Sequence, residues 1–176
     1  MKTLIKIIIL NAFWYAAVYF GPQSNLIEQI IFLISLLLVV ANYFIYQVKM
    51  PAKKYFMMLI YFLVYGYIQD LALSYYGLVQ YPSLFPPYWL LSMYAVFLCY
   101  YDDIFLKFRN FSLEVKIVIG MFGGPIAYLG GAKIADLIIP PDAKFWYIIF
   151  LAISWGIFFP ASLEAYQKME QTDGDA

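Results

Sequence analysis

Ionisable side chains within apolar segments are the residues of this sequence whose types and positions best suit chemistry. Asp70 lies inside one long apolar segment, and Lys133 and Asp136 lie near the end of another. An ionisable group that faces lipid is costly, so those found in membrane segments usually face the bundle interior or water. The helical rise places Asp70 about 22 Å and Lys133 about 25 Å from the starts of their predicted helices. An ion pair between Asp70 and Lys133 is therefore geometrically allowed.

Other interpretations of these ionisable residues stay open. Lys133 can extend its side chain to the membrane surface, while Asp136, one turn further along, ends its own helix near the interface. Asp102 and Asp103 form a second acidic pair, of a kind that can do acid–base or metal chemistry. The basic residues that follow this pair favour an interfacial helix end instead.

A glycine-rich stretch is the most informative segment of the chain. Gly123-Gly124-Pro125 predicts a kinked or interrupted helix, because glycine lets backbones approach closely and proline kinks or breaks a helix. Interrupted helices build substrate sites in transporters, whereas close packing around a kink needs no ligand, and the sequence supports both equally. Tyr128 lies in this stretch. It either lines a polar cavity, as Tyr65 can, or belongs to an aromatic belt.

The composition assigns the chain to the membrane proteins. Of the 176 residues, 65% are hydrophobic and 12% are charged, whereas about 25% of a typical soluble domain is charged. So few polar residues cannot cover the surface of a soluble protein of this size. The 18 tyrosines and 16 phenylalanines suit the headgroup level of a bilayer.

Six apolar segments approach or exceed the length of about 20 residues that crosses a bilayer. We expect helices over residues 3–20, 25–48, 55–79, 88–105, 116–139 and 145–163. The apolar runs are continuous rather than alternating, which argues against a membrane β-barrel. The predicted fold is therefore all-α, a polytopic transmembrane helical bundle of about six helices.

The basic residues predict the orientation of this bundle. Nine of the lysines and arginines fall on one side of a six-helix arrangement, which places both termini in the cytoplasm. Residues 1–166 then form a single transmembrane domain, and residues 167–176 form a polar cytoplasmic tail. The first apolar segment is interpreted as an uncleaved helix, because no small-x-small cleavage site follows it.

The sequence lacks the residues and motifs that several common kinds of catalysis and cofactor binding require. Histidine is absent, which removes the commonest general base and metal ligand. The single Cys99 cannot form an internal disulfide. No phosphate-binding loop, dinucleotide-binding glycine motif or catalytic serine motif occurs. We therefore expect no cofactor and no metal, and a net charge of zero argues against a nucleic-acid partner.

The glycine-rich stretch carries a resemblance to a known family. Its residues Gly123-Gly124-Pro125-Ile126-Ala127-Tyr128-Leu129-Gly130-Gly131-Ala132-Lys133 resemble the signature of the DUF2878 family of small bacterial inner-membrane proteins. Further positions that resemble the family are Asn11 with Trp14, Asp70 with Gly77, and Pro87 with Trp89. The resemblance covers nearly the whole chain except the tail.

That resemblance implies a multi-pass protein of the bacterial inner (plasma) membrane. Because members of the family are often encoded near fatty-acid-modifying enzymes, it also implies a role around membrane lipid. Members often carry histidine in the second and fourth helices, where this chain has residues such as Asn42 and Tyr100. A mechanism that depends on those histidines does not transfer to this chain.

Three functions are compatible with the sequence. The first is an accessory protein of membrane-lipid metabolism that binds a lipid or small amphiphile. The second is a small permease with Asp70 and Lys133 in one cavity. The third is a lipid-modifying enzyme that uses carboxylates. The residues predicted to bind the ligand are Asp70, Lys133, Tyr128, Gly123, Gly124, Pro125 and Trp14. Membrane lipid is the expected partner, and a second copy or another membrane protein stays open.

Overall fold

The computed structural model of the chain is a helical bundle, and it describes residues 2–46, 50–81, 85–101 and 104–171. Its elements are α1 (Lys2–Phe20), η1 (Gly21–Gln23), α2 (Asn25–Ile45), α3 (Ala52–Tyr75), α4 (Tyr88–Leu98), η2 (Phe105–Asn110), α5 (Leu113–Ile134) and α6 (Lys144–Gln171). No strand occurs in these ranges beyond one isolated bridge, between Gln80 and Ile138. The predicted all-α fold is confirmed.

Five of these helices are long and apolar enough to cross a membrane, namely α1, α2, α3, α5 and α6. All five leave large apolar side chains exposed, as expected for helices that contact lipid. The fourth predicted span, residues 88–105, is wrong in length. Helix α4 has 11 residues, or about 16 Å at the helical rise, which is about half of a bilayer core.

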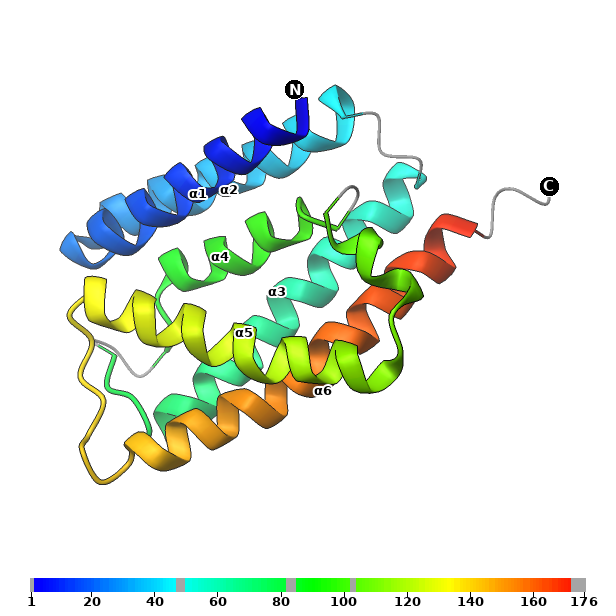
Figure 1. Cartoon of the computed structure of the whole chain (residues 1–176). Coiled ribbons are helices and arrows are strands. Elements are labelled where there is room, and N and C mark those ends of the chain that lie inside the picture. The colour runs from blue at the N-terminus through cyan, green and yellow to red at the C-terminus, as the bar shows by residue number, and fades with distance from the viewer. Residues whose placement is uncertain (1, 47–49, 82–84, 102–103, 172–176) are drawn as a thin grey trace.

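Helix α4 is short because it lies inside the bundle. It contacts α1, α2 and α3, and Figure 1 shows it between the α1–α2 pair and the layer of α3, α5 and α6. Seven of its residues are buried, including Trp89 and Tyr94. A helix surrounded by protein has no need to match the thickness of the membrane, so its length is set by its neighbours.

The helices alternate in direction along the chain, and both termini lie toward the same end of the bundle (Figure 1). The helix ends on this side carry most of the described basic residues, namely Lys6, Lys53, Lys54, Lys107, Arg109, Lys116 and Lys168. Lys133 and Lys144 lie at the opposite end. Because the six helices run back and forth through the bundle, both termini lie on the side where most of these basic residues lie. The cytoplasmic orientation stays a prediction. Helix α6 continues to Gln171, five residues into the predicted tail.

Local sequence signals explain where several helices begin and end. The side chain of Ser24 caps α2 by accepting a hydrogen bond from the backbone N–H of Ile27. Gly77 follows α3 with a φ of 67°, which lets the N–H of Leu78 bond back to the carbonyl of Leu73 at 2.9 Å. Asp136 has a φ of 54° and ends α5 in the same way. Asp136 therefore lies just past the end of α5, in the left-handed backbone conformation that closes the helix.

The amino terminus of α4 is held by a carboxylate from another helix. Glu28 of α2 accepts a hydrogen bond from the backbone N–H of Tyr88 at 2.8 Å, through Oε2. Tyr88 is the first residue of α4, where the helix dipole favours a negative charge. This contact joins the buried helix to the α1–α2 pair.

We expect Glu28→Ala to lower the free energy of unfolding by about 1 kcal/mol, the usual effect of losing a helix-capping group. Glu28→Gln, which keeps an acceptor oxygen but loses the charge, should have a smaller effect. Reversible unfolding in detergent micelles would measure both. Glu164→Ala is the matched control, because Glu164 is exposed and forms an ion pair with Lys168 on its own helix. Equal effects at Glu28 and Glu164 would contradict the capping role.

Helices α5 and α6 form the closest pair in the bundle, and glycines make that contact possible. A Cβ atom at Gly120 would lie 2.2 Å from the carbonyl oxygen of Trp155, and one at Gly124 would lie 2.2 Å from its Cγ. Gly156 of α6 meets Met121 of α5 in the same manner. The spacing of Gly120 and Gly124 is the small-xxx-small pattern of membrane helix pairs.

The predicted interruption of this helix is wrong, because α5 runs unbroken through Pro125. Proline removes one backbone donor, a loss that membrane helices tolerate when neighbouring groups compensate. Gly124 and Pro125 are both buried, with Trp155 packed against Gly124. Of the two interpretations of the glycines, close helix packing accounts for Gly120 and Gly124.

Candidate functional site

A cluster of buried polar side chains lies within the apolar bundle, centred on two consecutive residues of α3. Gln69 and Asp70 are 3% and 0% exposed. Polar groups in such an environment are costly unless they are hydrogen-bonded. Their partners come from the loop after α3 and from α4, α5 and α6, so the cluster joins most of the bundle.

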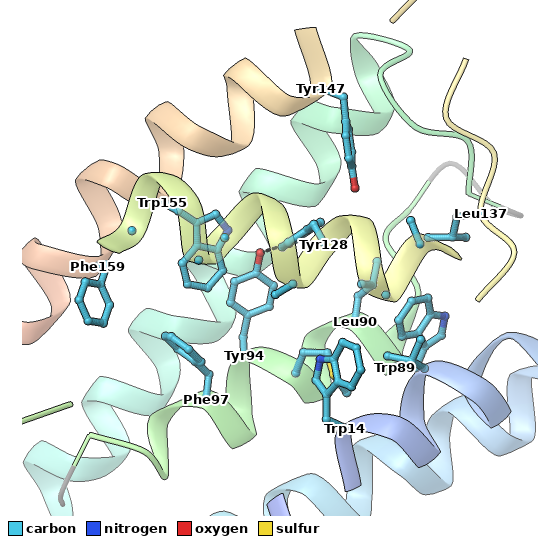
Figure 2. A pocket seen from close by; sticks show the side chains of 18 of the residues that line it. Trp14, Trp89, Leu90, Tyr94, Phe97, Tyr128, Leu137, Tyr147, Trp155 and Phe159 are labelled. Atoms are coloured by element: carbon cyan, nitrogen blue, oxygen red, sulfur yellow. Dashed lines mark hydrogen bonds between the residues drawn. The ribbon is translucent and has the colours of Figure 1, made fainter. Parts of the chain in front are cut away.

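Gln69 is the centre of this cluster. Its carbonyl oxygen accepts hydrogen bonds from the hydroxyls of Tyr65 at 2.7 Å and Ser154 at 2.6 Å. Its amide nitrogen donates to the hydroxyls of Tyr94 and Tyr128, each at 2.9 Å. The hydroxyls of Tyr65 and Ser154 also lie within hydrogen-bond distance of each other, so each single proton is shared between this contact and Gln69. Tyr94 and Tyr128 bond to each other (Figure 2). The amide therefore uses all of its usual donor and acceptor positions.

Asp70 accepts hydrogen bonds at only one of its two carboxyl oxygens. Its Oδ1 accepts from the hydroxyl of Tyr128 at 2.8 Å and from that of Tyr81 at 3.3 Å. Its Oδ2 is buried and has no hydrogen-bond partner among the described residues. Burial raises the pKa of Tyr81 well above its usual range, and the charge of Asp70 raises it further. The Tyr81 hydroxyl therefore stays protonated and acts as the donor.

The loop that carries Tyr81 is fixed against the end of α5. The backbone N–H of Gln80 donates to the carbonyl of Ile138 at 2.9 Å, which forms the isolated bridge. Gly77 lets the chain turn sharply out of α3 just before this contact. These two features bring the Tyr81 hydroxyl back to Asp70, eleven residues earlier in the sequence.

An aromatic pocket adjoins the polar cluster. Its volume is about 220 Å³, which exceeds the roughly 150 Å³ of a cavity that admits one benzene ring. Side chains from α1, α4, α5 and α6 surround it (Figure 2). The aromatic lining consists of Trp14, Tyr81, Trp89, Tyr94, Phe97, Phe105, Tyr128, Tyr147, Trp155 and Phe159. Tyr81, Tyr94 and Tyr128 therefore belong both to the pocket wall and to the polar cluster.

The pocket reaches the surface of the bundle along α5. Gly123 and Ala127 line it and are themselves exposed. A Cβ at Gly123 would meet no atom within 4 Å, so no side chain closes this part of the wall. Because α5 is one of the long apolar helices, this opening faces sideways from the bundle rather than toward one of its ends.

The structure brings most of the predicted site residues to this pocket. Trp14, Gly123, Gly124 and Tyr128 line it directly. Asp70 lies behind the wall, one hydrogen bond away through Tyr128. Pro125 is buried within α5, on the same turns as the lining glycines. Asp102 and Asp103, the second acidic pair, lie outside the described residues.

Lys133 does not join the site. Its side chain is exposed near the end of α5, and the described residues contain no ion pair between Lys133 and Asp70. The alternative interpretation, a side chain directed to the membrane surface, fits this position. Asp70 has tyrosine hydroxyls as partners instead.

Several important residues of the site were missed from the sequence, among them Gln69, Tyr81, Tyr94 and Trp155. Gln69 is adjacent to Asp70 in an apolar helix, and that position was a signal for a second buried polar group. Tyr94 and Trp155 gave no such signal, because aromatic residues are common throughout the chain. Among the other tyrosines, Tyr65 joins the cluster, whereas Tyr75 is 79% exposed.

Fold and site together define a helical membrane protein with an apolar pocket backed by a buried carboxyl group. Residues 3–161 match the family described as "Protein of unknown function (DUF2878)", so the chain belongs to this family, as its glycine-rich stretch predicted. No curated protein and no solved structure matches the chain.

Proposed function

We propose that this protein binds the chain of a lipid or small amphiphile in the aromatic pocket. It is a multi-pass protein of the bacterial inner membrane, with both termini in the cytoplasm. In this role it serves membrane-lipid metabolism as an accessory protein. The observation that carries the proposal is the sideways opening at Gly123, in an apolar pocket on a helix long enough to cross the membrane.

The size and chemistry of the pocket support this ligand class. Ligand sites are mostly apolar, with a few polar groups that fix the orientation of the ligand. Here the polar groups are the hydroxyls of four tyrosines and the indole N–H groups of three tryptophans, and the remaining wall is apolar. A volume of about 220 Å³ suits part of one hydrocarbon chain better than a two-chain lipid. No observation of this kind favours the permease or enzyme alternatives, and the Asp70–Lys133 pair of the permease is not formed.

Photocrosslinking tests the proposal. The protein in lipid nanodiscs would be irradiated with a long-chain alcohol that carries a diazirine in its chain, and the labelled peptides identified by mass spectrometry. We expect labelling of pocket residues on α4 and α5. Gly123→Leu should reduce that labelling about tenfold, because Gly123 lines the opening of the pocket and a leucine side chain there would narrow it.

Gly130→Leu is the matched control. Gly130 lies on the same helix, a Cβ there also meets no atom within 4 Å, and it does not line the pocket. Its labelling should equal that of the wild type. Labelling that is absent in the wild type, or equally reduced by both substitutions, would contradict ligand binding in this pocket.

A further inference from the structure

We infer that the ligand of the pocket carries a positively charged head group, an ammonium, selected jointly by the aromatic rings and by Asp70. The inference rests on the proposed function, since it names the chemical class of the ligand at the same site. Two features lead to it, the composition of the pocket wall and the charge behind that wall, and the hydrogen bonds of the tyrosine hydroxyls are consistent with both.

The hydroxyl protons of Tyr128, Tyr81 and Tyr94 are used within the polar cluster. Tyr128 and Tyr81 donate to Asp70. Because Tyr128 already donates to Asp70, the bond between Tyr128 and Tyr94 has Tyr94 as its donor. The side-chain nitrogen of Gln69 donates to the hydroxyl oxygens of Tyr94 and Tyr128, and so uses one lone pair of each oxygen. Lone pairs of Tyr94 and Tyr81 remain for a ligand that donates hydrogen bonds. The same wall also holds donors, among them the hydroxyl of Tyr147 and the Nε1–H of Trp155, which is buried without a hydrogen-bond partner among the described residues.

The pocket wall suits a cation and not an anion. Three of the four tryptophans of the chain, Trp14, Trp89 and Trp155, line it. Figure 2 shows rings from different helices directed into one space. Aromatic faces attract ammonium groups, and tryptophan does so most strongly. None of the described residues that line the pocket is a lysine or an arginine, so the head group of an anionic amphiphile would meet no opposite charge.

Asp70 supplies the negative charge for this selection. It is completely buried, and the residues that hydrogen-bond to it are uncharged tyrosines that line the pocket. A buried carboxylate without an opposite charge is costly. An ammonium group in the pocket would provide that charge across one layer of tyrosine hydroxyls, in an interior whose low dielectric constant strengthens interactions between charges.

A competition experiment separates this inference from the proposed function. The crosslinking alcohol would be displaced from wild-type protein in nanodiscs by dodecyltrimethylammonium, dodecanol or dodecanoate, each at the same mole fraction of the lipid. With dodecylammonium, whose N–H groups can donate to the tyrosine hydroxyls, added as a fourth competitor, we expect both cations to compete about tenfold more strongly than the alcohol. The carboxylate should compete more weakly than any of them. Equal competition by all four would overturn the inference and leave ligand binding intact. Loss of Gly123-dependent labelling would overturn both.

Asp70→Asn tests the source of the preference. Asparagine keeps an acceptor for the tyrosine hydroxyls but cannot carry the negative charge, so the advantage of the cations should fall to about twofold, the part left to the rings. Dodecanol should compete as it does with the wild type. Asp136→Asn is the control, because it removes an exposed negative charge and asparagine tolerates the same positive φ. An undiminished cation advantage in Asp70→Asn would overturn the role of Asp70. If Asp70→Asn does not fold, the wild-type series decides alone.

Discussion

Gly120→Ala is expected to destabilise the protein by about 3 kcal/mol, a large effect for the addition of one methyl group. The new Cβ would lie 2.2 Å from the backbone carbonyl oxygen of Trp155 and 2.8 Å from its carbon. Those atoms belong to the backbone of α6, so no side-chain rotation can relieve the overlap. Helix α6 would have to move away from α5, and the packing of Trp155 in the pocket wall would be disturbed as well.

The other glycines of α5 provide internal controls for this prediction. Cβ atoms at Gly123 and Gly130 would meet nothing within 4 Å. Alanine at either position should therefore be neutral or stabilising, by up to about 1 kcal/mol, because alanine is the better helix former. Unfolding in mixed detergent micelles would compare the three variants. A similar result for Gly120→Ala and Gly130→Ala would mean that the α5–α6 contact is looser than the structure indicates.

The helices could be predicted because their signals are local. Helices α1 and α2 begin and end within three residues of the predicted spans, since apolar runs, Gly21-Pro22 and Ser24 are all readable in the sequence. The predicted length of the fourth helix was wrong for a physical reason. Residues 88–105 are apolar whether lipid or protein surrounds them, so hydropathy cannot distinguish a spanning helix from a short buried one.

The site was predictable only in part, for a related reason. Asp70 and the glycine-rich stretch stand out because a charge and a run of glycines are unusual in an apolar chain. Their actual partners do not stand out. Gln69 bonds to Ser154, 85 residues away, and to Tyr128, 59 residues away. One sequence carries no information about such distances, and for that reason the exposed Lys133 was as plausible a partner for Asp70 as Tyr128.

Gln69→Leu is the substitution expected to damage the polar cluster most, at a cost of about 3 kcal/mol in the free energy of unfolding. Leucine occupies a similar volume but makes none of the four hydrogen bonds to Tyr65, Ser154, Tyr94 and Tyr128. Each buried polar group left without a partner costs about 1–3 kcal/mol. The hydroxyl pairs Tyr65–Ser154 and Tyr94–Tyr128 persist, which limits the total to less than the sum of four losses.

Gln167→Leu is the matched control for this prediction. Gln167 lies in α6, and its side-chain nitrogen is buried with no hydrogen-bond partner among the described residues. The same chemical change there removes an unsatisfied donor, so the free energy of unfolding should stay constant or rise. Thermal unfolding of both variants in the same detergent measures the difference. If Gln69→Leu proves no more harmful than Gln167→Leu, the cluster contributes little to stability, because burial of leucine then compensates for every bond that Gln69 makes.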